Sequence, residues 1–308
     1  MSTTSVYKLL ALDLDGTLLP RSQTLSSRTI RALERVSSHG AVVALVTGRT
    51  LASTASVSAQ LPFANFSIVA HGAAAFPPKL NAKIESLFAT PLSPPSVDAI
   101  VAVADELDLA VEWHETHGKV KLRATSEKQR MRVDAALLYH GSSAEIVVDF
   151  ESAEPPVKIL LLTDQPQPVK EYLASRVPGI TAYSERLFVD CVSDQVNKAI
   201  GLRKLCEALH VHMNDVVAFG DGWNDVDMLK EVGLSFAMAN AVDGVKDASH
   251  RVARFSNEED GVAHEVEELL SQGFFGVIPR VEATAADKEN VTRTRDSGIA
   301  VASPTSHR

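Results

Sequence analysis

The chain has 308 residues, of which 45% are hydrophobic, and a formal net charge of −9. This length suffices for one large domain or two ordinary ones with ample core. The acidic balance argues against a nucleic-acid-binding protein, whose phosphate-binding surface is basic. Cys191 and Cys206 are the only cysteines, so no disulfide framework is expected and a reducing compartment fits. No signal peptide or run of membrane-spanning length is visible, and we expect a cytoplasmic protein without a membrane partner.

Three apolar runs alternate with helical patterns in the first quarter of the chain. A helix that begins at Ser26 or Ser27 and stops at Gly40 follows the first run, and another occupies the fifties. This β-α-β-α-β order of strands and helices favours right-handed crossovers and a doubly wound parallel sheet. The runs end, in chain order, at Asp13-Leu14-Asp15-Gly16, at Thr47-Gly48-Arg49 and at His71-Gly72.

The pattern changes after a proline-rich stretch between residues 77 and 95. Neighbouring apolar segments with hairpin-length gaps predict an antiparallel sheet with helices on one face, that is, an α+β insert. The predicted strands are 109–113, 119–122, 145–150, 157–162, 181–183 and 187–191, and the predicted helices are 97–107, 127–139 and 169–176. From Val196 the alternation of helices and strands returns, with a strand running into Asp221 and a last helix over 261–272.

The predicted fold is α/β: a Rossmann-like doubly wound parallel sheet as the core, with an inserted α+β cap. We expect a core made of residues 1–76 and 184–278 and a cap of residues 77–183. Residues 279–308 are rich in polar and charged side chains without lasting periodicity, which predicts a disordered tail.

Two carboxylates one residue apart, Asp13 and Asp15, close the first predicted strand. Strand alternation points both side chains the same way, and ligands of open α/β sheets bind at this end of the strands. Two like charges this close repel, so a cation or a proton must offset them. A solvated Asp-x-Asp-Gly turn is the alternative that this stretch alone leaves open.

Six motifs in order resemble the haloacid dehalogenase-like hydrolases, and within them the Cof-type branch with a large α/β cap. The resemblance covers roughly residues 7 to 272. The motifs are Asp13-Leu-Asp-Gly-Thr17, Val46-Thr-Gly-Arg49, Lys198, Gly220-Asp-Gly-Trp-Asn-Asp225, Ala237-Met-Ala-Asn-Ala241 and Asn257-Glu-Glu-Asp-Gly-Val-Ala263.

The resemblance implies a phosphatase that acts through an aspartyl-phosphate. Asp13 would be the nucleophile, and Asp15 the acid that protonates the leaving group and then the base that activates water. Thr47 and Lys198 complete the implied catalytic set. The implied phosphate-binding residues are Leu14, Thr47, Gly48, Lys198 and Asn224.

The implied cofactor is Mg²⁺, a hard cation that prefers oxygen ligands. By resemblance, Asp13, the backbone carbonyl of Asp15, and Asp221 would hold it. Asp225 would support the metal waters or Lys198 from behind the ligands.

Other interpretations of single residues stay open. Lys198 alone would be a solvated helix lysine, Thr47 could also be a helix N-cap, and Arg49 is expected in a structural ion pair. His114 and His117 are interpreted as surface residues of the insert, since no further His or Cys nearby completes a ligand set. At the third strand end His71 stands where the family usually has Asn, which puts the substrate contacts of that loop in doubt.

The function expected is hydrolysis of a small phosphorylated metabolite, such as a sugar phosphate or a related monoester. A phosphomutase acting on hexose phosphates is an alternative, because phosphomannomutases resemble the same core and cap. A catalytically silent binding protein on this scaffold is another. The sequence identifies neither the substrate nor the oligomeric state, monomer or homodimer.

Overall fold

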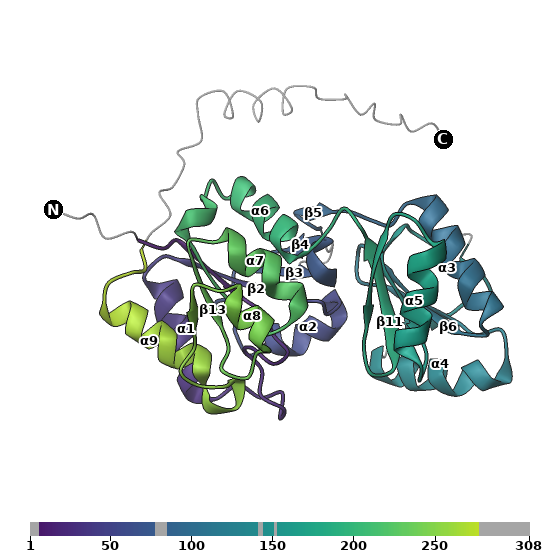
Figure 1. The fold of residues 1–308 in the computed structure, drawn as a ribbon, viewed down its shortest axis with the longest axis horizontal. Coiled ribbons are helices and arrows are strands. Elements are labelled where there is room, and N and C mark those ends of the chain that lie inside the picture. The colour runs from purple at the N-terminus through teal and green to yellow at the C-terminus, as the bar shows by residue number, and fades with distance from the viewer. Residues whose placement is uncertain (1–5, 78–84, 141–143, 151–152, 277–308) are drawn as a thin grey trace, which may run out of the picture. The chain divides into compact units, whose positions relative to one another are not determined.

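The computed structural model describes residues 6–77, 85–140, 144–150 and 153–276. In these ranges the chain builds two sheets, one of eight strands and one of six, each with helices packed on it (Figure 1). The α/β class predicted from the sequence is confirmed. The tail predicted over residues 279–308 lies outside the described residues. No helix within the described ranges is long and apolar enough to cross a membrane.

The first sheet has the strand order β14-β13-β12-β1-β2-β3-β4-β5. Six neighbouring strands are parallel, as expected for the core: β14 (Arg251–Val252), β13 (Leu234–Ala237), β12 (Val216–Gly220), β1 (Leu9–Leu12), β2 (Val42–Val46) and β3 (Phe66–Val69). An antiparallel hairpin, β4 (Ala74–Phe76) and β5 (Phe88–Ala89), extends this sheet and was not among the predicted strands.

Five helices of the first sheet follow the predicted order: α1 (Ser27–Ser38), α2 (Leu51–Ser58), α6 (Lys198–Ala208), α7 (Val226–Glu231) and α9 (Gly261–Ser271). The short helix α8 (Asp243–Asp247) was not predicted. Ser26 caps α1, because its side chain accepts a hydrogen bond from the Thr29 amide. Leu33 and Val36 on the apolar stripe of α1 pack into the core that β1, β2 and α9 share. Thr50, and not Thr47, caps α2 through a capping box with Ser53.

The register of the central strands determines which residues emerge together at one edge of the sheet. Leu12 of β1 is paired with Leu45 of β2 on one side and with Phe219 of β12 on the other. The three strands therefore end at the same level, and the residues that follow them emerge at one edge of the sheet.

The second sheet has the order β10-β11-β9-β6-β7-β8. Its strands are β6 (Ala110–Glu115), β7 (Val120–Arg123), β8 (Ala144–Ile146), β9 (Pro156–Leu162), β10 (Ile180–Ser184) and β11 (Phe188–Ser193). All neighbouring pairs are antiparallel except β7 and β8, which run parallel, so the prediction of a purely antiparallel sheet was wrong at this edge. Strand β11 belongs to this sheet although its residues follow the predicted boundary at residue 183.

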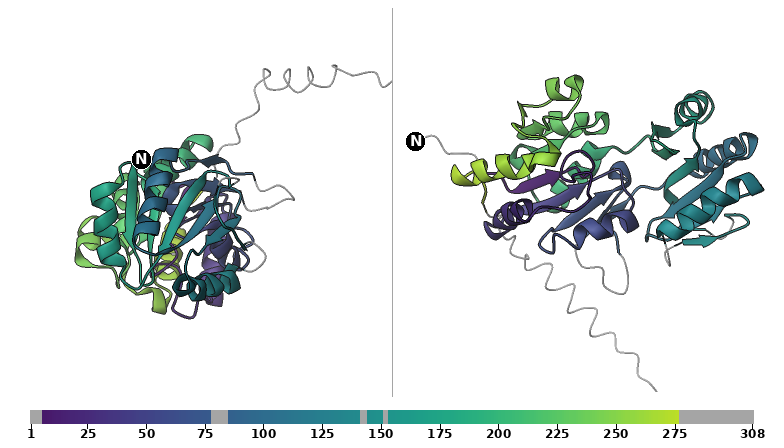
Figure 2. Two further views of the ribbon diagram at one scale, coloured as in Figure 1. Left: turned by 90° about the vertical axis from the view of Figure 1, so that its right-hand side faces the viewer. Right: turned by 90° about the horizontal axis from the view of Figure 1, so that it is seen from below.

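Helices pack on both faces of the second sheet, whereas one face was predicted. Helices α3 (Pro94–Glu106) and α5 (Pro166–Arg176) pack against side chains such as Val111 and Ile159. Helix α4 (Glu127–His140) packs against Ala110 and Leu160, which alternation places on the opposite face. We call strands β6–β11 with helices α3–α5 the cap; Figure 2 gives two further views of it beside the first sheet.

Gly72 lets the turn after β3 lie directly against the start of α6. Its φ is +101°, and a Cβ atom there would lie 2.1 Å from the carbonyl oxygen of Asn197. Both features exclude a side chain, because the obstructing atom belongs to main chain and the conformation favours glycine. Asn197 is the N-cap of α6, whose first residue is Lys198, so this contact positions the lysine.

We expect Gly72→Ala to lower the free energy of unfolding by about 2 kcal/mol or more, since it combines backbone strain with a main-chain clash. Gly273→Ala is the matched control, because its φ is +73° but nothing lies within 4 Å of the added Cβ. It should cost only about 1 kcal/mol for the left-handed conformation. Denaturant unfolding compares the two, and equal losses would contradict the role assigned to the Gly72 contact.

Candidate active site

Three carboxylates converge at the edge where the central strands end. Asp13 follows β1, Asp221 follows β12, and Asp225 lies in the short turn after it. Ligand oxygens of these three side chains lie within 4.8 Å of one another. Asp13 and Asp225 are buried and Asp221 is half-buried. Gly16 permits the approach of Asp221, because a Cβ at residue 16 would lie 2.2 Å from its Oδ2.

Lys198 provides the positive charge among these carboxylates. Its Nζ donates to Asp13 Oδ1 at 2.5 Å and to Asp225 Oδ1 at 2.7 Å. The other oxygen of Asp225 accepts hydrogen bonds from the main-chain amides of Asp221 and Gly222. The lysine is 1% exposed, so it is not the solvated helix lysine that its position alone would allow.

Burial and mutual repulsion shift the pKa values of this cluster. Burial and the neighbouring Asp225 carboxylate raise the pKa of Asp13 well above its usual range, although Lys198 opposes this. Burial likewise raises the pKa of Asp221. Burial would lower the pKa of Lys198, but the carboxylates of Asp13 and Asp225 raise it instead. One ammonium thus faces three carboxylates, and a further cation would relieve the repulsion.

The donor set fits a hard divalent cation such as Mg²⁺. Asp13, Asp221 and Asp225 offer carboxylate oxygens only, and Thr17 holds Asp221 in place by donating to its Oδ1 at 2.7 Å. Asp15 does not join this group through its side chain.

Asp15 is held by Arg49 instead. The guanidinium donates to both carboxylate oxygens, from Nε at 2.7 Å and from Nη2 at 2.5 Å. The expectation that Arg49 forms an ion pair is confirmed. The Asp15 side chain is 56% exposed, so it can rotate away from the arginine without unpacking the core.

The remaining predicted residues line the same edge. Thr47 is buried at the end of β2, and its hydroxyl accepts from the Arg49 amide at 3.1 Å. Thr47, Gly48 and Asn224 line a cavity of about 760 Å³ together with Asp13, Asp15 and Asp221. The side chain of Leu14 is buried in the apolar core, so only its main chain can contact a ligand.

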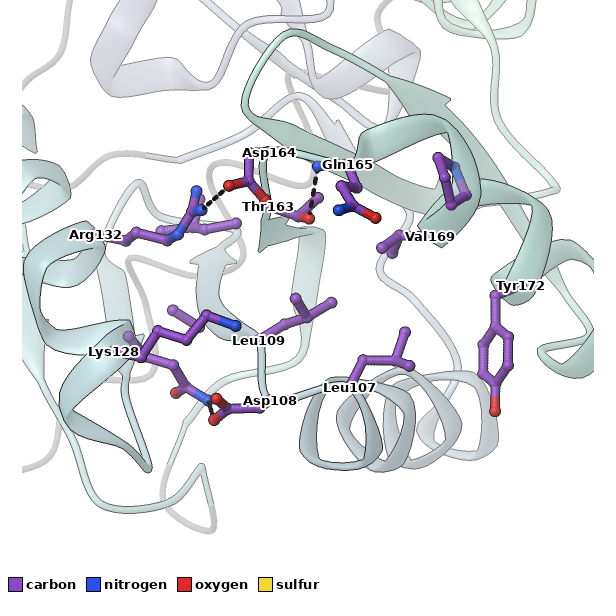
Figure 3. Close-up of a pocket in the computed structure, with 14 residues that line it drawn as sticks. Leu107, Asp108, Leu109, Lys128, Arg132, Thr163, Asp164, Gln165, Val169 and Tyr172 are labelled. Carbon is purple, nitrogen blue, oxygen red and sulfur yellow. Dashed lines mark hydrogen bonds and ion pairs between the residues drawn. The ribbon is translucent and has the colours of Figure 1, made fainter.

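This cavity extends from the strand ends of the first sheet to the cap. Its cap wall includes Glu112, His114, Lys158, Glu185 and Asp190. A second cavity, of about 320 Å³, lies within the cap and contains none of the predicted catalytic side chains (Figure 3). The larger cavity is therefore the candidate active site.

Comparison with known proteins identifies the family. The sequence profile of the haloacid dehalogenase-like hydrolases matches residues 10–266. The chain belongs to this family. The Cof-type assignment and the expectation of a phosphatase enzyme are confirmed at that level.

Relatives and solved structures match over most of the hydrolase. The 5-amino-6-(5-phospho-D-ribitylamino)uracil phosphatase YcsE of Bacillus subtilis is 28% identical over 83% of this chain and 93% of its own. A second 5-amino-6-(5-phospho-D-ribitylamino)uracil phosphatase of that organism, YitU, is 26% identical over 85% of this chain and 97% of its own. A haloacid dehalogenase-like hydrolase from Bacteroides thetaiotaomicron superposes with a TM-score of 0.73 at 27% identity, over 85% of this chain and 99% of that one.

His71, which replaces the family's usual Asn, links the strand ends of this hydrolase to the cap. Its Nδ1 lies 3.4 Å from the Asn224 amide nitrogen, and its Nε2 donates to Asp190 Oδ2 at 2.9 Å. The ring also stacks on Tyr183, with centroids 4.0 Å apart. The φ of His71 is +55°, a left-handed conformation that Asn and His adopt more readily than most residues.

Lys158 makes a second link between the cap and the strand ends. Its Nζ donates to the carbonyl oxygen of Gly48 at 2.7 Å and pairs with Asp190. Burial alone would raise the pKa of Asp190, but Lys158 and His71 lower it, so the carboxylate stays ionised. Burial lowers the pKa of His71, which fits a neutral ring that donates from Nε2.

The interpretation of His114 as a surface residue was wrong, while His117 is indeed exposed. His114 is 3% exposed and contacts Glu112 and His140. Sequence analysis missed this group because His140 lies on a different element, at the end of α4. The sequence did offer one indication of a buried polar group, because charged residues interrupt the apolar strands β6 and β9.

We expect Lys158→Met to lower the free energy of unfolding by about 3–5 kcal/mol, because it leaves the Asp190 carboxylate buried beside a neutral imidazole. Adding Asp190→Asn should restore part of the loss by removing the uncompensated charge. Lys121→Met on β7 of the same sheet is the control, since its partner Glu145 is 59% exposed, and should cost less than about 1 kcal/mol. Chemical denaturation measures all three. A loss for Lys158→Met no larger than the control would rule out the buried pair as a structural link.

Proposed function

We propose that this hydrolase is a Mg²⁺-dependent phosphatase that hydrolyses small phosphorylated metabolites through an aspartyl-phosphate. The observation that supports this most directly is the contact of Lys198 with Asp13, beside Asp221 and at the end of a cavity that the cap closes. Phosphoryl transfer requires an in-line nucleophile and positive charge at the phosphoryl oxygens, and this arrangement supplies both.

In the first step, a carboxylate oxygen of Asp13 attacks phosphorus while the bond to the leaving oxygen breaks. Lys198, the Thr47 hydroxyl and the main-chain amides of Leu14 and Gly48 hold the phosphoryl oxygens, with Asn224 as a further donor. Asp15, once it has left Arg49 and taken up a proton from solvent, gives that proton to the leaving oxygen, which departs as an alcohol.

In the second step, Asp15 accepts a proton from a water molecule that attacks the phosphorus of the aspartyl-phosphate. The bond between phosphorus and Asp13 breaks, inorganic phosphate leaves, and the Asp13 carboxylate is restored. Arg49 is available to pair with Asp15 again once the proton has moved on.

Mg²⁺ would be held by Asp13, the carbonyl oxygen of Asp15, and Asp221. When bound, it supplies positive charge that neutralises the phosphoryl oxygens and orients them. Asp225 would not bind the ion directly but would position the groups around it, since it accepts hydrogen bonds from Lys198 and from the Asp221 amide.

The cap would select the substrate, and we propose that it extends beyond the expected residues 77–183 to include β11. Among the described residues, Asp190 Oδ1 is a buried atom without a hydrogen-bond partner, on a residue that lines the cavity. This favours a substrate with hydroxyl or amino donors, such as a sugar phosphate or the ribitylamino compound named for the Bacillus relatives. A cytoplasmic location stays a prediction.

Replacing Asp13 with Asn should lower the rate of phosphate release at least about 100-fold, because the amide cannot form the aspartyl-phosphate. Asp243→Asn is the matched control, because this carboxylate is 99% exposed, and it should retain the full rate. Turnover is measured on a panel of phosphorylated metabolites with Mg²⁺, and circular dichroism verifies the fold. A folded Asp13→Asn enzyme with more than about a hundredth of the parent rate would exclude Asp13 as nucleophile.

The balance of products separates a phosphatase from a phosphomutase. With Mg²⁺ and a hexose 1-phosphate that the enzyme consumes, free phosphate should appear in the same molar amount as the ester that is lost, because Asp15 activates the water that takes the phosphoryl group from Asp13. Without Mg²⁺, neither change should occur. Conversion to the hexose 6-phosphate with little free phosphate would favour the phosphomutase alternative.

A further inference from the structure

Glu112, His114 and His140 form a cluster of metal-ligating side chains on the cap wall of the cavity, apart from the aspartates. Glu112 and His114 lie two residues apart on β6, so strand alternation points both side chains to the same face. Helix α4 packs on β6 and ends at His140, which reaches the pair from the side.

The spacing of the three donor atoms suits a bound cation. Glu112 Oε2 lies 3.2 Å from His114 Nε2 and 3.0 Å from His140 Nε2, and all three atoms fall within 4.8 Å of one another. Two ligand atoms that each lie about 2.0–2.2 Å from one tetrahedral zinc ion are themselves about 3.3–3.6 Å apart, so small side-chain movements would bring these atoms to that spacing. The imidazole planes meet at 67°, so the rings approach the carboxylate oxygen from different directions.

Glu112 and His114 have the charges that metal binding requires. Burial would raise the pKa of Glu112, but hydrogen bonds from His114 and His140 lower it to about 2. Burial lowers the pKa of His114 and keeps that ring neutral. Lys158, the neighbouring cation, has its charge offset by its ion pair with Asp190.

We propose that Glu112, His114 and His140 bind a divalent transition-metal ion, and we expect this ion to be zinc. Two imidazoles and one carboxylate are a ligand set of zinc enzymes, whereas Mg²⁺ prefers oxygen ligands alone. The ion replaces the protons that the two Nε2 atoms share with Glu112, and each ring then carries its proton on Nδ1. Because all three residues line the cavity, the open coordination positions face it and accept water or an oxygen donor of a bound molecule.

Zinc binding to the full-length protein tests the proposal independently of the phosphatase activity. Protein stripped of metal with a chelator is titrated with zinc in the presence of millimolar Mg²⁺, which occupies the aspartate site. We expect one zinc ion per chain with micromolar or tighter affinity. His114→Gln and His140→Gln should each weaken binding at least about 100-fold.

Two control variants assign the bound ion to this cluster. His117→Gln changes an exposed histidine two residues after the end of β6, whose ring contacts Glu154, and should leave the zinc affinity unchanged. Asp221→Asn should also retain the zinc ion, because it alters only the carboxylates at the strand ends. Loss of zinc in Asp221→Asn with retention in His140→Gln would assign the metal to the aspartates and overturn the proposal.

Cobalt(II) provides a readout on the parent protein that does not depend on the variants folding. Bound at the cluster, it should give visible absorption bands typical of nitrogen ligation, and zinc should displace it. A parent protein that binds no zinc under these conditions, or whose cobalt spectrum shows oxygen ligation alone, would contradict the site. In that case the three residues form only a hydrogen-bonding wall of the cavity.

Discussion

The structure depends on one buried lysine placed among carboxylates at the ends of parallel strands. Removing an ion from water costs several kcal/mol even after the protein relaxes, so each charge here needs a partner. Lys198 satisfies one oxygen each of Asp13 and Asp225, and Asp225 uses its other oxygen to accept from two main-chain amides. One ammonium does not balance three carboxylates, and this excess of negative charge supports the proposed binding of a cation and a phosphate group.

Local sequence patterns predicted this edge of the sheet well, because each signal is contained in a few adjacent residues. An apolar strand, a carboxylate and a glycine at residue 16 suffice to place Asp13 at a strand end. Parallel strands of similar length then bring Asp13, Thr47 and Asp221 to one level, as the pairing of Leu12 with Leu45 and Phe219 demonstrates. The sequence predicted an ion pair for Arg49 but did not identify the partner, and the structure shows that it is Asp15.

The cap was predicted less completely, because its polar contacts join residues far apart in the chain. Glu112 and Lys158 interrupt apolar strands, which indicates polar residues on a buried face, but a strand pattern alone does not identify their partners. His140 meets Glu112 only because α4 packs on the face of the sheet opposite to α3 and α5. The parallel pairing of β8 with β7 sets where α4 must run, and a three-residue strand carries too little pattern to reveal its direction.

In the proposed mechanism, the same buried charges would couple substrate selection to phosphate binding. Gly48, in the loop expected to hold phosphate, also accepts a hydrogen bond from Lys158 of the cap. His71 joins Asn224 to Asp190 in the same way, so both links from the cap end on residues beside the reacting atoms. Opening the cap would separate the Asp190 carboxylate from His71. Separating buried partners is costly unless water or a ligand replaces the lost contact. A substrate that donates to Asp190 would lower that cost, so in the proposed mechanism the cap would close most readily on a leaving group that makes this contact.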